Sequence, residues 1–558
     1  MSDISQARVR KARFGRDAAE AAAKEKVPFK NGDLLAIFFA LLYAVAALGL
    51  KNWLAFDDVF GSVFLGGQHH FLYDATVIFA SILAGRYSLK LTSPGLMKRN
   101  SRLLMLFCVC AAELLIASAM LFVLSRPFVE KHFGITPAQV AIWAPYLLPA
   151  LLAPALATLL SDAGGGRAVC IGIGISHAIF VPIDMALPVF LMCLIPSFIK
   201  HRHIAKVRRR SQLLAAFAQA VPPQFIGALM PLAYYFGSAK MGDINNGAAL
   251  GVCMALTVFS VAASFVATII LLPLFEHIFA TCSNIKLNNY ADLEHPLLRI
   301  LSNDAPGTYQ HAMKVADLAF GAAEKIGANP LLCRVGAYFH DIGKIDNPRY
   351  FGENLGFNEQ NPHDKLPPSM SASILEAHIK QGLAHAYANT FPPELRRMIK
   401  EHHGTTVKDF FLFKARNQAK LKALETGSEP ERVDESSFRY DSDKPTAKET
   451  GILLLADSVE AAARGETRSL DNVTPQFISN LVEDVTKKKI NDGQFDECPL
   501  SFTEINAIKK SFIVTLQHIL HNRIAYPKEM PKDSPASKDS AAAANAPDNS
   551  KPSTKPAN

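Results

Sequence analysis

Three features are missing from this chain, and each absence excludes a kind of fold, site or targeting segment. None of its eight cysteines is spaced as CxxC, so neither a disulfide framework nor a zinc ribbon is predicted. No small-residue cleavage site of the A-x-A kind follows the first apolar run, which therefore indicates a retained anchor and not a removed signal. Alternating β-branched runs are scarce in the second half, and this excludes a large sheet there.

The positive charge of the chain is arranged as in membrane proteins. The net charge is +8, and the lysines and arginines gather in residues 1–31 and in short loops between apolar runs. Cytoplasmic loops of membrane proteins carry such an excess. We therefore expect a lipid bilayer as partner and no nucleic-acid polymer.

The first half of the chain is predicted to be a transmembrane domain of about eight helices, over residues 32–275. A spanning helix needs about 20 apolar residues. The apolar runs are 34–50, 70–85, 102–125, 137–160, 168–183, 184–199, 212–237 and 246–274. The even count, with the basic segment 1–31 inside, predicts a multi-pass protein of the cytoplasmic (inner) membrane whose two ends both face the cytoplasm.

Two ionisable residues, Glu113 and His177, lie inside apolar runs. Such groups are costly at membrane depth and are usually paired or functional. We expect an interhelical hydrogen bond or a water-lined crevice, with ligand or proton sensing as the alternative.

The second half of the chain is predicted to be an all-α soluble domain over residues 285–525. Apolar residues recur there at spacings of three and four, as in amphipathic helices. The charged, proline-containing stretch 416–447 has no apolar period and predicts a long surface excursion. Residues 526–558 have almost nothing to bury and are predicted to be disordered.

Histidines and aspartates in this second half form the candidate site. Imidazole and carboxylate ligands suit Mn, Fe and similar metals, and seven of them exceed what one ion can use. Adjacent side chains on a helix point about 100° apart, so the aspartate of the His-Asp pair suits a position between two ions. We assign His311, His340, Asp341 and Asp457 to one ion and Asp341, His378, His402 and His403 to the other.

Two divalent cations sharing a water would make a nucleophile for phosphodiester hydrolysis. Asp341 and Lys344 are the predicted catalytic residues: Asp341 bridges the ions, and Lys344 lies about one turn beyond it, where it could neutralise a phosphate oxygen. His363 and His385 have no such context, and His363 is expected to order a loop or touch substrate.

With these residues in view, the chain resembles the HD-domain metal-dependent phosphohydrolase superfamily. Within it, the chain resembles the seven-transmembrane-receptor HD family (PgpH type) of cyclic-di-AMP phosphodiesterases. The resemblance covers most of residues 70–525, and its specific motifs are LPLFEHIF, HPLLRILSNDAPGTYQH, NPLLCRVGAYFHDIGKI, NPHDKLPPSMSASIL, EHHGT and LLLADSVEAAARG. The resemblance implies a helical membrane bundle followed by a cytoplasmic all-α HD domain with two Mn or Fe ions. It also implies hydrolysis of cyclic di-AMP to pApA, and thus control of a second messenger.

The chain departs from the family pattern in three places. Only residues 51–69 stand where an extracellular domain is usual, Asp441, Ser442 and Asp443 replace a Pro-Gly-Pro, and the loop after HDIGK reads Glu353, Asn354 and Leu355. Hydrolysis of cyclic di-GMP or (p)ppGpp, or a nucleotide-binding membrane receptor without catalysis, are the alternatives. The sequence leaves assembly into a homodimer open.

Overall fold

The computed structural model describes residues 33–55, 71–97, 100–124, 126–133, 143–181, 185–237, 246–356, 359–467 and 473–520. The predicted basic N-terminal segment and the predicted disordered tail lie outside the described residues. Within the described part the fold is helical, and the only strand-like feature is an isolated antiparallel bridge between Val407 and Arg439. The predicted all-α class is confirmed.

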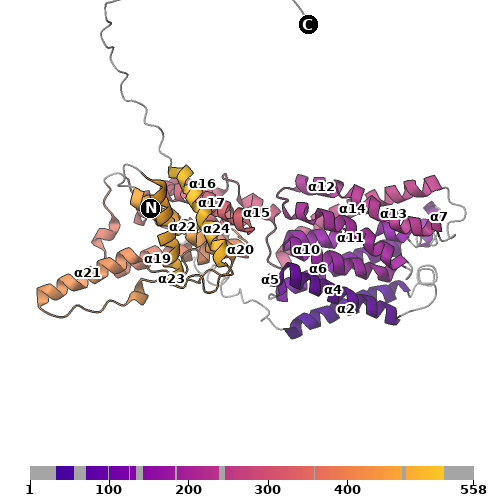
Figure 1. Cartoon of the computed structure of the whole chain (residues 1–558), viewed down its shortest axis with the longest axis horizontal. Helices are drawn as coiled ribbons and strands as arrows, with labels where there is room; N and C mark the ends of the chain where they lie inside the picture. Colours follow the sequence, from indigo (N-terminus) through magenta and orange to yellow (C-terminus); the bar gives the residue numbers. More distant parts are fainter. Residues whose placement is uncertain are drawn as a thin grey trace, which may run out of the picture.

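Every apolar run found in the sequence contributes a helix to the N-terminal half. The elements are α2 (Asp33–Ala55), α4 (Phe71–Thr92), α5 (Pro94–Met97), α6 (Asn100–Leu124), α7 (Pro127–Phe133), α9 (Leu152–Leu160), α10 (Ala163–Ser176), the 3₁₀ helix η1 (His177–Phe180), α11 (Ala186–Ala205), α12 (Arg210–Ala218), α13 (Val221–Gly237) and α14 (Asn246–Ile278). In Figure 1 these helices, indigo to magenta, form one bundle.

Five helical stretches among the described residues are long and apolar enough to cross a membrane. They are Asn100–Leu124, Trp143–Leu160, Ala163–Phe180, Arg210–Tyr234 and Ala249–Ile278. Two shorter apolar helices, Ile37–Leu50 and Ala186–Pro196, accompany them. The protein is therefore a polytopic membrane protein, while the count of about eight spans stays a prediction.

Glu113 and His177 meet inside this bundle. His177 Nε2 lies 3.1 Å from Glu113 Oε1, and both side chains are fully buried. Glu113 Oε2 accepts a hydrogen bond from the backbone N–H of Ala153, and His177 Nδ1 contacts Cys193 Sγ at 3.3 Å. The two residues thus form the interhelical pair that the sequence predicted.

The C-terminal half is a second helical domain, pink to yellow in Figure 1. Its helices are α15 (Asn284–Tyr290), α16 (Pro296–Asp304), α17 (Pro306–Ile326), α18 (Pro330–Phe339), α19 (Pro368–Ala388), α20 (Pro393–Glu401), α21 (Asp409–Thr426), α22 (Lys448–Thr467), α23 (Pro475–Asn491) and α24 (Phe502–Leu520). Short 3₁₀ helices lie between them: η3 (Ile342–Asp346), η4 (Pro348–Tyr350), η5 (Gly352–Asn354), η6 (Pro362–Lys365) and η7 (Glu435–Phe438).

Local signals fix where the long helices of this domain begin and end. Proline is the first residue of α17, α18, α19 and α20, a position where its missing N–H costs nothing. The Asn329 side chain caps α18 by accepting the N–H of Leu332. Helix α17 stops at Gly327, whose φ of 70° is left-handed. Two apolar cores, one around α17, α22 and α24 and one around α16, α18 and α20, hold these helices rigidly.

One sequence prediction is wrong in part: the excursion assigned to 416–447 begins as helix. Helix α21 runs to Thr426, and in Figure 1 it extends away from the rest of the domain. Only two of its first residues and Ala423 are buried. A helix exposed almost all round needs no apolar period, so the periodicity test could not detect it.

Candidate metal centre

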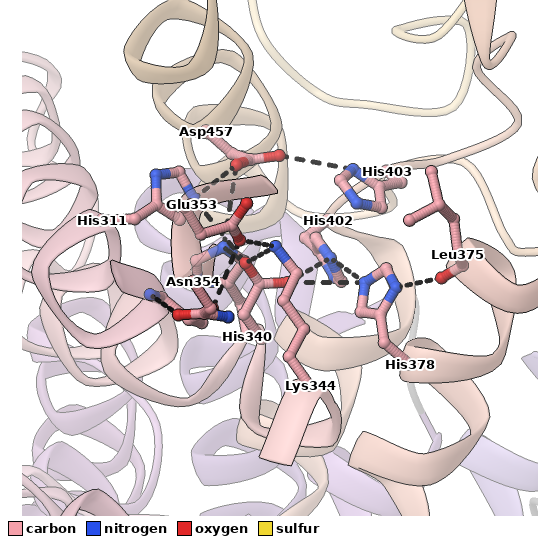
Figure 2. A network of polar contacts seen from close by, with 12 residues as sticks. His311, His340, Lys344, Glu353, Asn354, Leu375, His378, His402, His403 and Asp457 are labelled. Carbon is pink, nitrogen blue, oxygen red and sulfur yellow. Dashed lines mark hydrogen bonds and ion pairs between the residues drawn. The ribbon is translucent and has the colours of Figure 1, made fainter. Parts of the chain in front are cut away.

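The seven predicted ligands come from five helices and meet in one place. Figure 2 labels all of them except Asp341. His311 lies in the second turn of α17, His378 on α19 and Asp457 on α22. The other four stand where helices end: His340 caps the C-terminus of α18 and Asp341 follows it, while His402 caps α20 and His403 follows. Helix ends let two successive residues turn towards one centre.

A close backbone approach brings Asp341 to α19. A Cβ atom on Gly343 would lie 1.9 Å from the carbonyl oxygen of His378. Only glycine fits at this distance. The glycine of the HDIGK motif therefore lets η3 pack directly on the helix that carries His378.

Asp341 stands between two groups of ligands and turns one carboxylate oxygen to each. Its Oδ2 lies 3.2 Å from His340 Nε2 and 3.7 Å from His311 Nε2. Its Oδ1 lies 3.4 Å from His378 Nε2 and 3.7 Å from His402 Nε2. This is the geometry expected of a carboxylate that bridges two cations.

The remaining acid, Asp457, completes the first group and touches the second. Its Oδ1 lies 3.0 Å from His311 Nε2 and 3.7 Å from His340 Nε2, and its Oδ2 lies 3.3 Å from His403 Nδ1. The ligand atoms fall into two sets, each within 4.8 Å of one another: Asp341, His378, His402 and His403, and His311, His340 and Asp457. The structure brings together all seven predicted ligands.

Hydrogen bonds on the outer side of four rings decide which nitrogen points inward as an acceptor. The Nδ1 atoms of His340, His378 and His402 donate to the carbonyl oxygens of Ala337 (2.7 Å), Leu375 (2.5 Å) and Ile399 (2.7 Å). His311 Nδ1 donates to Glu460 Oε2 at 2.5 Å. In a neutral imidazole the other nitrogen then carries a lone pair. The Nε2 atoms of His311 and His340 face carboxylates, and those of His378 and His402 face each other.

His378 and His402 show why a cation fits here. Their Nε2 atoms lie only 3.2 Å apart. Burial and the positive neighbours lower the pKa of His402 well below its usual value, and burial lowers the pKa of His378 to about 3. Both rings are therefore neutral near pH 7, with two acceptor atoms face to face. A metal ion between them satisfies both.

The other group can hold either protons or a cation. Burial opposes the charged form of His340, but Asp341 overcomes it and raises the pKa to about 10. Burial is likewise outweighed at His311 by Asp457 and Glu460, which raise its pKa. A divalent cation would take the place of these protons, since metal ligands bind in their deprotonated forms.

Lys344 lies beside this centre, as the sequence predicted, but it is held by a residue that the sequence reading left in a loop. Lys344 Nζ lies 2.7 Å from Asp341 Oδ2 and 2.7 Å from Glu353 Oε1. Burial raises the pKa of Glu353, but Lys344 lowers it to about 2 overall. Asn354 fixes the same loop by accepting the N–H of Thr308. Glu353 therefore lies at the site itself, two residues before Leu355, where the loop reads Glu-Asn-Leu in place of the family's Glu-Asn-Gln.

Glu460 is the functional residue that the sequence reading missed. Its side chain is almost fully buried, and it accepts the hydrogen bond from His311 Nδ1 that orients the ring. Its spacing of three from Asp457 on α22 places both acids on one helix face, and this spacing was the available signal.

The histidines His363 and His385 lie apart from the ligand sets: His363 Nε2 contacts the Tyr350 carbonyl (2.8 Å) and His385 contacts Asp346 (3.2 Å).

His403 is the most exposed of the seven ligands. This side chain is 19% exposed, whereas those of His340, His378 and His402 are at most 1% exposed. The Tyr440 ring stacks on His403 with centroids 4.4 Å apart and lies 4.4 Å from Lys408 Nζ. An incoming anion would therefore meet His403 first.

Comparison with known proteins assigns both halves. Residues 71–283 match the family described as "7TM receptor with intracellular HD hydrolase", and residues 308–462 match the HD domain. The chain belongs to this 7TM receptor family with an intracellular HD hydrolase. The match to the HD domain begins three residues before His311 and ends just after Glu460.

The relatives of this 7TM receptor HD protein include two curated enzymes. The chain is 41% identical over 287 residues to "Cyclic-di-AMP phosphodiesterase PgpH" of Bacillus subtilis (strain 168), a match that covers 51% of this chain and 38% of the relative. The protein of the same name from Listeria monocytogenes serotype 1/2a (strain 10403S) is 40% identical over 266 residues (48% and 35%). Among solved structures, the chain matches the crystal structure of the L. monocytogenes PgpH HD domain in complex with cyclic-di-AMP at 40% sequence identity and a TM-score of 0.37. The match covers 42% of this chain and 100% of the solved chain. The match thus spans less than two fifths of the curated relatives' length.

Proposed function

We propose that this protein is a membrane-anchored, metal-dependent phosphodiesterase that hydrolyses cyclic di-AMP to pApA and so controls a second messenger. One observation carries the proposal: inward-facing Nε2 atoms of buried histidines surround the two oxygens of Asp341. His311, His340 and Asp457 would hold one ion, His378, His402 and His403 the other, and Asp341 both. Two Mn or Fe ions bound there would supply an activated water for attack on phosphorus.

The protein's own residues prepare this site for a phosphodiester. The outer hydrogen bonds hold the rings in a fixed orientation, so that little reorganisation is needed when ligands bind. Lys344 carries a buried positive charge 2.7 Å from Asp341, where it can pair with a non-bridging phosphate oxygen. Asp341 and Lys344 are thus the proposed catalytic residues.

The substrate is inferred from the relatives, whose printed name is cyclic-di-AMP phosphodiesterase. We propose the cytoplasm as the location of the HD domain, because the basic N-terminal segment and the described family both favour an intracellular domain. A homodimer stays a proposal without a contact that supports it.

The test uses the full chain purified in detergent with Mn²⁺. Cyclic di-AMP, cyclic di-GMP and (p)ppGpp are supplied in competition, and the products are separated by chromatography. We expect preferential formation of pApA and two metal ions per chain by elemental analysis. Preferential turnover of a guanine nucleotide would contradict the substrate, and metal-loaded protein that binds but hydrolyses nothing would contradict the enzyme.

A matched pair of variants on α19 separates the metal centre from the rest of the domain. His378→Ala removes a ligand, and we expect loss of activity together with loss of one metal ion. His385→Ala removes a histidine two turns along the same helix, whose ring pairs with Asp346. We expect this control to retain both ions and activity; equal losses in the two variants would contradict the ligand assignment.

A further inference from the structure

A partly buried ion pair joins the membrane domain to the HD domain. Arg102, in the first turn of α6, places Nη2 2.8 Å from Glu394 Oε1 in the first turn of α20, and the two side chains are 16% and 19% exposed. Arg102 Nη1 also donates to the carbonyl oxygen of Leu160 at the end of α9 at 3.4 Å. The guanidinium is therefore fixed from the membrane side while it holds the HD domain.

Helix α20 leads straight from this ion pair to the metal centre. It has nine residues, so its length is about 13 Å, and its C-terminal cap is the ligand His402. Apolar side chains hold it along its length, including Leu395 and Ile399, both fully buried. A helix this short and this well packed moves as one body, so a shift at Glu394 displaces His402 and His403.

The far end of α20 is bonded to another ligand-bearing helix. Both oxygens of Glu401 accept hydrogen bonds at the start of α22: from the N–H and hydroxyl of Thr446 and from the hydroxyl of Thr450, each at 2.8 Å. Helix α22 carries Asp457. Movement of α20 is therefore passed to both ligand groups.

A second contact reaches the third ligand-bearing helix in the same way. Asn284 donates to the carbonyl oxygen of Ala205, the last residue of α11, and its own carbonyl accepts from Asn329 Nδ2, both at 3.0 Å. Asn329 caps the start of α18, which ends at His340, and its backbone N–H donates to Glu449 in the first turn of α22. The start of α20 is thus linked directly to the membrane domain, the start of α18 through Asn284, and the start of α22 through Asn329 and Asn284. Each of these helices carries a ligand at its end or farther along its length.

We propose that Arg102 and Glu394 are positioning residues, through which the membrane domain sets the placement of His402 and His403 and hence the metal affinity of the HD domain. The inference rests on the proposed function and adds the route by which that site is regulated. Each change in the packing of α6 within the bilayer would act on the centre through this ion pair.

Charge reversal in the full chain tests the link. Arg102→Glu and Glu394→Arg are made singly and together, and Mn²⁺ affinity is measured from the signal of free Mn²⁺ in electron paramagnetic resonance, alongside kcat and KM. We expect each single variant to weaken Mn²⁺ binding by about fivefold, since such couplings are typically 1–3 kcal/mol. The double variant, which restores the pair with opposite polarity, should return to within about twofold of the wild type.

Two further variants keep the outcome interpretable. Arg299→Glu reverses an arginine of the HD domain whose partner Glu294 lies 3.9 Å away and is exposed, and we expect no change in Mn²⁺ affinity. Arg102→Gln, a milder change, covers the case in which charge reversal prevents folding, and it should give a smaller loss in the same direction.

The failures of the two proposals are distinguishable. A wild type that binds two ions and hydrolyses cyclic di-AMP, with unchanged Mn²⁺ affinity in folded Arg102→Glu and Arg102→Gln, would overturn the positioning role and leave the function standing. Unrecovered affinity in a folded double variant would also overturn it. A wild type without metal binding or hydrolysis would overturn the function itself.

Discussion

The membrane domain and the HD domain each bury histidines against carboxylates, but the ratio of histidines to acids differs between them. In the membrane domain one histidine meets one acid, and the outer atoms of the pair, His177 Nδ1 and Glu113 Oε2, contact Cys193 Sγ and the Ala153 N–H. In the HD domain five histidines surround two aspartates, and the inward nitrogens of His378 and His402 meet as acceptors. In the first arrangement the histidine faces an acid, whereas in the second two neutral rings face each other, and a cation between them would satisfy both.

The comparison gives a rule for separating structural from metal-binding histidines. Burial does not distinguish the two sites, because both are almost fully buried. The partner of the inward nitrogen does: His177 Nε2 faces a carboxylate, whereas the Nε2 atoms of His378 and His402, two neutral rings whose Nδ1 atoms donate to carbonyls, face each other. The predictions below test this rule in order of expected effect.

Asp341→Ala should have the largest effect, because it removes the carboxylate that turns one oxygen to His340 and the other to His378. We expect a loss of hydrolysis on the order of 10³-fold, corresponding to several kcal/mol of lost metal assistance, and fewer than two ions per chain by elemental analysis. Asp346→Ala, five residues along and paired with His385, is the control and should retain both ions. Full activity of the Asp341 variant would refute the two-ion arrangement.

Glu113→Gln should destabilise the protein and leave the metal centre intact. Removing one partner of a buried pair typically costs about 3–5 kcal/mol. We expect a clear fall in the midpoint of thermal unfolding in detergent, with two Mn²⁺ still bound at low temperature. Glu130→Gln, at an exposed position on α7, should change neither quantity. Loss of Mn²⁺ without loss of stability would show that the comparison of the two sites is mistaken.

Glu460→Gln should weaken the metal centre without removing a ligand. The carboxylate orients His311 through a 2.5 Å hydrogen bond, and loss of such an outer partner typically lowers metal affinity or activity by about 10–100-fold. Titration with Mn²⁺ measures the effect, and Glu483→Gln, an acid that pairs with Lys509 near the surface, serves as control. Wild-type Mn²⁺ affinity in the Glu460 variant would mean that the ring is held by packing alone.

The ligands could be predicted from sequence because their residue types are unusual on the inward faces of helices. His378 and Asp457 each stand within apolar helical patterns, and buried polar groups need partners. Glu460 could have been found from its spacing to Asp457, but an acid beside an arginine one turn away also suits a solvated helix face. Amphipathic periodicity likewise predicted the long helices with a buried face.

What the sequence could not show depends on distant contacts or on the lack of an apolar pattern. Arg102 and Glu394 are 292 residues apart, and no local pattern links them. Helix α21 is rich in good helix formers such as Ala, Lys, Leu and Gln, yet it buries so little that period-based reading missed it. The hydrogen bonds that fix the histidine tautomers are also tertiary, so the sequence could name the ligands but not their orientation.

The smallest effect is expected at Asp492, which makes an ordinary ion pair near the centre. Arg439 donates to both oxygens of Asp492 and to the carbonyl oxygen of Thr405, two residues beyond His403. Burial raises the pKa of Asp492, but Arg439 outweighs it and the net pKa is lowered. The folded pKa is therefore below the unfolded value of about 3.9, so the pair stabilises the fold at pH above that value and loses this effect as pH falls through the folded pKa.

Asp492→Asn should accordingly cost less than about 1 kcal/mol at pH 7, because both side chains are partly exposed. Denaturant unfolding of wild type and variant at pH 7, 5 and 3.5 should show a gap that is constant between the first two and narrows at the last. A gap that widens on acidification would contradict the sign. Asp492 already has a cationic partner in Arg439 and is not a metal ligand, so the variant should bind Mn²⁺ as the wild type does. This result would distinguish an ion pair between protein side chains from the ligand cluster that requires a metal.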